Sequence, residues 1–139
     1  MTDDKAAAWR EQRRAAAAAH GELLADRQRA ESARAQELID AFVRRALASG
    51  PSPVPLMARS YDGRAHYRTP LTGWYLRRDE TVAIDTEGRF YVLTAPSSLT
   101  ARLRGVTPEP SAPPLVIGAG GKDGESLDMA DALARVLAR

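Results

Sequence analysis

The sequence of 139 residues contains no cysteine. The absence of thiols excludes disulfide bonds, thiolate metal ligands and cysteine nucleophiles. Histidine occurs only at His20 and His66, and no dense cluster of carboxylates accompanies either one. Because structural zinc sites need four such ligands, we expect no zinc site. The sequence predicts no metal and no cofactor.

Long apolar runs are also missing. The longest, Ala15–Ala19, is far shorter than the roughly 20 apolar residues that cross a bilayer. The chain opens with Asp3 and Asp4 close to its N-terminus, which does not resemble a secretory signal peptide. We therefore expect a cytoplasmic protein without a membrane partner.

Lysine is nearly absent, so the basic charge is almost entirely arginine. The chain also lacks asparagine and is rich in alanine, a combination typical of a GC-rich coding sequence. Arginine richness by itself therefore does not indicate a function that requires guanidinium groups. The net charge is only +2, which is not the signature of a polyanion-binding protein.

Residues 3–48 are predicted to form one long helix, within an N-terminal unit of residues 1–48. Thr2 can cap its start, and Asp3 and Asp4 suit the positive end of the helix dipole. Gly50 and the following proline mark its end. A wide apolar face occupies only the last third of the helix: Ala35, Leu38, Ile39, Phe42, Val43, Ala46 and Leu47. We expect that third to pack on the rest of the protein.

The first two-thirds of this helix has few large apolar residues. Four residues at heptad spacing form a narrow line that could contact a partner helix: Trp9, Ala16, Leu23 and Ala30. A regular coiled coil needs a second apolar position in each heptad, where this chain has Gln12, Ala19 and Asp26. Isolated stretches of helix are marginal unless packed, although the alanine content helps, so we predict a protein partner or self-association through this line.

The remainder divides into a connection, residues 49–70, and a compact part, residues 71–139. The connection is rich in proline and glycine, and its Asp62-Gly63 pair is a hairpin-turn signal. Three short runs with β-branched and aromatic residues follow: 73–78, 81–85 and 89–94. A short helix is expected at 98–103, a short strand at 115–117, and a closing amphipathic helix from a Ser126 cap to about residue 138.

These patterns predict an α+β fold: a long N-terminal helix, an antiparallel β-meander of three to five strands and a C-terminal amphipathic helix. Alternation along the strands places one set of side chains on a core face: Trp74, Leu76, Val82, Ile84, Phe90 and Val92. Tyr75, Arg77 and Tyr91 are expected on the opposite face.

Arginine and aromatic residues interleave through this strand region, and such residues on one sheet face can stack bases and hold phosphates. The candidate nucleic-acid contacts are Arg64, Tyr67, Arg68, Tyr75 and Arg77. Cross-strand pairs of this kind also stabilise ordinary sheets, and the sequence contains no RNP-type consensus. Nucleic-acid binding is therefore the alternative to protein interaction.

A glycine-rich loop between the last strand and the last helix is the third candidate site. Its backbone N–H groups could hold a ligand at Gly118, Gly120, Gly121 and Lys122. Asp123 follows the lysine, where a P-loop requires serine or threonine. A structural turn is therefore the favoured interpretation of this loop.

No set of residues indicates catalysis. His66 is the only histidine in the strand region, and Ser60 near it lacks the sequence context of a nucleophile. The sequence therefore favours a non-enzymatic interaction or assembly module that uses its N-terminal helix.

Overall fold

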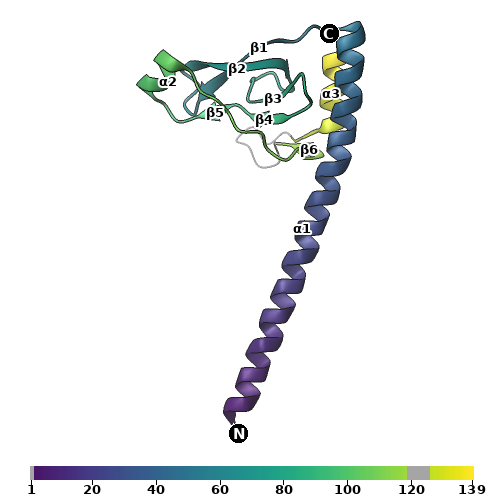
Figure 1. The fold of residues 1–139 in the computed structure, drawn as a ribbon, viewed down its shortest axis with the longest axis vertical. Coiled ribbons are helices and arrows are strands. Elements are labelled where there is room, and N and C mark those ends of the chain that lie inside the picture. The colour runs from purple at the N-terminus through teal and green to yellow at the C-terminus, as the bar shows by residue number, and fades with distance from the viewer. Residues whose placement is uncertain (1, 119–125) are drawn as a thin grey trace.

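The structure, a computed structural model, describes residues 2–118 and 126–139. It has the α+β fold that the sequence predicts (Figure 1). Helix α1, Thr2–Ser49, runs past one side of a compact body and projects far beyond it. It ends where predicted: Gly50 has a φ of 88° and its N–H donates to the Ala46 carbonyl oxygen at 2.7 Å.

The body is built on five strands: β1 (Val54–Ser60), β2 (His66–Tyr75), β3 (Val82–Asp85), β4 (Phe90–Val92) and β5 (Thr94–Ala95). Their order in the sheet is β4-β3-β2-β1-β5. The first four form the predicted antiparallel meander, and β5 pairs in parallel with β1. The region 49–70 thus contains the predicted hairpin, and both of its strands belong to the main sheet.

The sheet closes on itself. Only Leu93 separates β4 from β5, yet these strands are at opposite ends of the strand order. Leu93 joins both ends, since its N–H donates to the Thr81 carbonyl oxygen and its own carbonyl accepts from Arg59. Residues 90–95 therefore close the curled sheet into a small barrel-like body.

Closure gives the sheet a core on each face. The outer face packs against α1 and the C-terminal helix α3, Met129–Leu137, through Trp74, Leu76, Val82, Ile84 and Phe90. Phe42 of α1 meets Trp74 edge-on, with ring centroids 5.2 Å apart. The inner face has its own apolar cluster of Leu56, Ala83, Tyr91 and Leu93.

The prediction was wrong for two residues of these faces. Tyr91, expected on a face opposite the core, is buried because the closed sheet covers it. Val92, expected in the core, is 48% exposed where β4 ends.

The remaining elements are short. Helix α2, Leu99–Arg104, lies where predicted, and Ser98 caps it by accepting a hydrogen bond from the Ala101 N–H. Strands β6, Val116–Ile117, and β7, Leu127–Asp128, form a separate pair. The predicted Ser126 cap is wrong, because β7 continues to Asp128 and α3 begins only at Met129, with Asp128 in the N-cap position.

Candidate interaction surfaces

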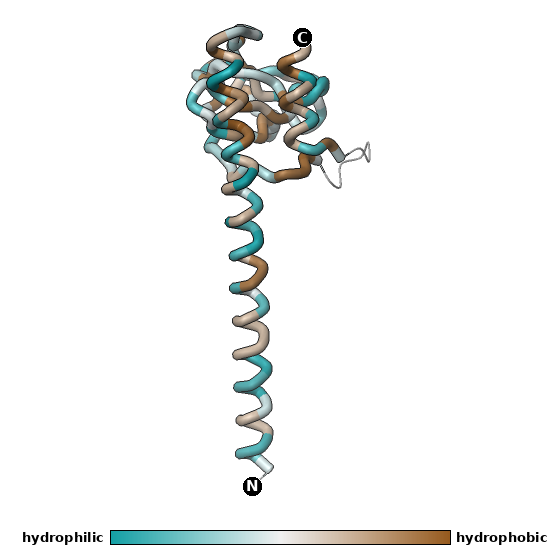
Figure 2. The backbone as a smooth tube through the Cα atoms, turned by 90° about the vertical axis from the view of Figure 1, so that its right-hand side faces the viewer, coloured by the Kyte–Doolittle hydropathy of each residue, from teal (hydrophilic) through white to brown (hydrophobic). Residues whose placement is uncertain are grey.

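The projecting part of α1 leaves every residue from Thr2 to Leu24 exposed. Hydrophilic and apolar residues alternate along this segment, whereas strongly apolar residues gather in the body (Figure 2). Contact with the body begins near Glu31, whose side chain accepts a hydrogen bond from the Leu115 N–H. Residues 2–30 thus form a projection about 44 Å long at 1.5 Å per residue.

We call the four residues of the predicted partner surface the seam: Trp9, Ala16, Leu23 and Ala30. All four are exposed, and Trp9 and Leu23 expose 58% and 56% of their surface. The guanidinium carbon of Arg13 lies 4.7 Å from the centre of the Trp9 ring system, a cation–π arrangement. The structure therefore brings the seam residues onto one open surface.

The Arg/aromatic surface predicted for nucleic acid does not form as expected. Tyr67 is 1% exposed, and its hydroxyl oxygen accepts a hydrogen bond from the Ser98 N–H. The prediction of Tyr67 as a base-stacking residue is therefore wrong. Tyr75 is half-buried and accepts a hydrogen bond from the Met57 N–H; burial raises the pKa of its hydroxyl.

The three arginines of that prediction lie in different environments. Arg77 exposes only 20% of its side chain and pairs with Asp79 at 3.7 Å. Arg64 is exposed, and Arg68 is exposed while donating a hydrogen bond to the Leu103 carbonyl oxygen. Arg64 and Arg68 thus belong to the end of the body that carries α2.

This end, which we call the distal tip, comprises the β1–β2 turn, residues 61–64, together with α2. Figure 1 places α2 at the end of the body away from α1. A hollow of about 440 Å³ opens here, with Arg64, Leu99 and Arg102 in its lining. The sequence analysis did not select Leu99, Arg102 or Leu103 as site residues. Their signal was the predicted short helix, in which leucines four residues apart share a face.

Ser60 and His66 do not form a catalytic pair. The Ser60 hydroxyl donates to the Asp62 carboxylate at 2.6 Å and accepts from the Ala65 N–H. Together with the Arg64 N–H, this contact lowers the pKa of Asp62 and fixes the hairpin turn. His66 instead lies 3.3 Å from the Arg59 guanidinium.

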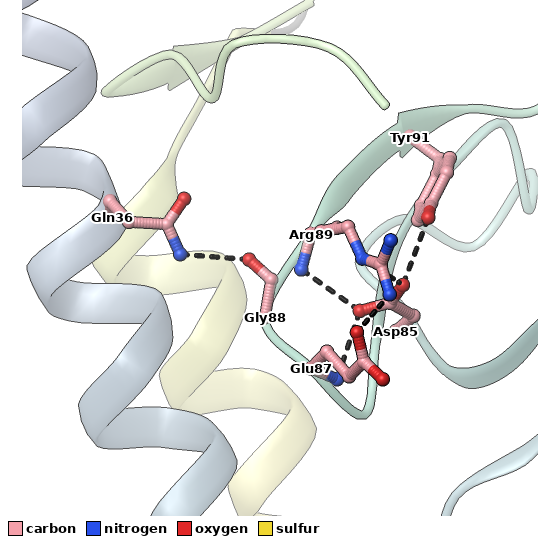
Figure 3. A network of polar contacts seen from close by, with 6 residues as sticks. All are labelled: Gln36, Asp85, Glu87, Gly88, Arg89 and Tyr91. Carbon is pink, nitrogen blue, oxygen red and sulfur yellow. Dashed lines mark hydrogen bonds and ion pairs between the residues drawn. The ribbon is translucent and has the colours of Figure 1, made fainter. Parts of the chain in front are cut away.

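Asp85 is a buried carboxylate, but its contacts stabilise a turn (Figure 3). One oxygen accepts the N–H groups of Glu87 and Arg89, and the other accepts the Tyr91 hydroxyl at 2.9 Å and pairs with the Arg89 guanidinium. Burial, with the Asp85 hydrogen bond second, raises the pKa of Tyr91. Gln36 of α1 donates to the Gly88 carbonyl oxygen, which attaches this turn to the helix.

The glycine-rich candidate loop falls mostly outside the described residues. Gly120, Gly121 and Lys122 lie in that part, and Gly118, with a φ of 75°, is its one described member. Within residues 2–118 and 126–139, no group of three or more acidic or histidine side chains is placed to hold a metal ion. None of the helices in these ranges combines the length and apolarity needed to cross a bilayer.

Comparison of the chain with protein-family models, curated proteins and solved structures finds no significant match.

Proposed function

We propose that this chain is a non-enzymatic assembly module in which the α1 helices of two copies pair in parallel through the seam. The observation that carries the proposal is the projection of residues 2–30, a surface on which every residue up to Leu24 is exposed. An unpacked helix gains stability from its sequence alone only marginally, so a second helix along the seam supplies the missing packing. The alanines at two of the four seam positions allow close approach.

The position of the seam leaves room for this partner. Successive residues of an α-helix lie about 100° apart around its axis. The side of α1 that packs on the body is marked by buried Ala35, Ile39 and Ala46. The seam lies about 130° around the helix from that side. The α1 helix of a second copy can therefore run along the seam without meeting the body of the first copy.

Charge favours the parallel orientation. A basic row lies beside the seam: Arg13, His20, Arg27 and Arg34. In an antiparallel pair this row would face the same row of the other copy, and the like charges would repel each other. In a parallel pair, Glu22 of one copy instead faces Arg27 of the other, five residues further along. Arg29, which would face Arg34, is already paired with Asp26 of its own helix.

The first test compares two identical substitutions on opposite sides of α1. Ala16→Asp places a carboxylate in the seam, and Ala18→Asp places one about 200° away; both positions are exposed. Light scattering over a range of concentrations should give a dimer for the wild type and for Ala18→Asp, and a monomer for Ala16→Asp. A monomeric wild type, or equal effects of both substitutions, contradicts the proposal. Ultraviolet absorbance across the same peak reports bound nucleic acid, the alternative function.

The second test uses the absence of cysteine, because one introduced thiol is then the only thiol in the chain. Leu23→Cys should form a disulfide-linked dimer under mild oxidation, since a parallel pair brings the two copies of position 23 together. Ala18→Cys is the matched control and should remain uncrosslinked. A dimer by light scattering without crosslinking of Leu23→Cys would contradict the parallel orientation while preserving dimerisation.

A further inference from the structure

The distal tip carries the large apolar side chains with the highest exposed fractions among the described residues. Among the described large apolar residues, the three most exposed are Tyr61, Leu99 and Leu103, at 72%, 77% and 78%. Tyr61 belongs to the β1–β2 turn, and both leucines belong to α2. These side chains contribute almost nothing to the core and are available for contact with a partner.

Helix α2, which carries the two leucines, is held against the body by packing and hydrogen bonds. They are four residues apart and therefore lie on one side of the helix. Ala101 is buried on the other side, in a cluster with Tyr67. The Arg68 side chain donates to the Leu103 carbonyl oxygen at 3.0 Å, and the Val106 N–H donates to the Arg68 carbonyl oxygen at 2.8 Å.

The charge around these leucines is positive. Residues 60–68 and 96–107 contain one acidic residue, Asp62, and four arginines, which gives these segments a net charge of +3. The arginines are Arg64, Arg68, Arg102 and Arg104. Arg64 and Arg102 line the hollow beside Leu99, together with Ser97, Ser98 and the one carboxylate, Asp62. The hollow thus places guanidinium and hydroxyl donors next to an exposed apolar side chain.

In contrast to the expectation of no membrane partner, we propose that the distal tip docks on the surface of an anionic lipid bilayer. Leu99 and Leu103 enter the boundary between headgroups and acyl chains, and the surrounding arginines contact lipid phosphates. Tyr61 suits the same boundary, where aromatic side chains with a polar end accumulate. Leucine is under-represented among the residues that dominate protein–protein binding, which favours a lipid surface over an acidic protein as the occupant.

Sedimentation with lipid vesicles tests this proposal, which does not depend on dimerisation. The full-length protein should sediment with vesicles of phosphatidylcholine and phosphatidylglycerol, and should remain in solution with phosphatidylcholine alone. Leu99→Ser combined with Leu103→Ser should weaken binding by about tenfold or more, because two buried leucines supply the apolar part of the affinity. Leu24→Ser combined with Leu47→Ser, two exposed leucines of α1, is the matched control and should bind as the wild type.

Two results would overturn the proposal. One is failure of the wild type to sediment with anionic vesicles, including the case in which the tip binds an acidic protein instead. The other is binding that the Leu99/Leu103 variant retains in full, which would reduce the interaction to charge alone. Circular dichroism should show unchanged folding of that variant, since both leucines are over three-quarters exposed.

Discussion

Gly73 occupies a place in β2 where the neighbouring strand leaves no room for a side chain. It is paired with Asp85 of β3. A Cβ atom at residue 73 would lie 1.9 Å from the Ile84 carbonyl oxygen and 2.7 Å from the Asp85 Cα atom. Both are backbone atoms in a closed sheet, so a larger residue displaces a strand and not merely a side chain.

We predict that Gly73→Ala lowers the free energy of unfolding of the body by about 2–3 kcal/mol, the cost of overpacking a core. Urea denaturation measures this loss. Gly21→Ala is the control, since no atom lies within 4 Å of a Cβ built there. That variant should increase the helicity of α1 and leave the urea midpoint of the body unchanged. An unaltered midpoint for Gly73→Ala would show that β2 and β3 separate easily.

Single residues were predictable where the signal was local. The glycine after α1 follows from the neighbouring residues and was placed correctly. Tyr67 and Tyr91 were misplaced because strand alternation states only which residues share a face. Alternation does not reveal that the opposite face is also covered. Here that face is covered because β1 pairs with β5, a strand far from it in the sequence.

At the scale of elements, the long helix was the most predictable feature. Its start and stop signals are strong, and its bounds agree with the sequence analysis to within two residues. Strand β2 was less predictable, because the predicted division between residues 70 and 71 falls inside it, at Pro70. The register of β1 and β2 shifts at this point, so the proline, which lacks an N–H, lies in an irregularity of a continuous strand. Thr69 donates to the Leu56 carbonyl oxygen there.

The buried and exposed faces of the docked end of α1 should respond very differently to side-chain truncation. Phe42→Ala removes the ring that packs on Trp74 and should lower the free energy of unfolding by about 3–5 kcal/mol, through the lost contact and the cavity. Leu47→Ala, at a 55% exposed position of the same helix, should cost less than about 0.5 kcal/mol. Thermal or urea unfolding measures both values. Similar losses for the two variants would contradict the arrangement of α1 on the body.

At the scale of the whole molecule, the two proposed surfaces lie far apart. The seam is on the projecting part of α1, and the distal tip is at the other end of the body (Figure 1). A two-fold axis parallel to the paired helices places the two bodies on opposite outer sides, because the body-facing side of α1 lies about 130° from the seam. The two tips of such a dimer face away from each other.

If both proposals hold, the dimer should join vesicles to one another. The wild type should increase the turbidity of anionic vesicle suspensions, whereas monomeric Ala16→Asp should bind vesicles without raising turbidity. The Leu99/Leu103 serine variant should do neither. Equal turbidity with wild type and Ala16→Asp would contradict the two-fold arrangement.

The length of α1 also determines how the protein moves through solution. A compact chain of 139 residues has a radius of gyration of about 14 Å, whereas a 48-residue helix is about 72 Å long. The friction on such an extended particle exceeds that on a sphere of equal mass. A monomer will therefore leave a gel-filtration column early and sediment slowly, so that its elution volume imitates a dimer. Scattered light, which reports mass independently of shape, is the measurement that separates the two.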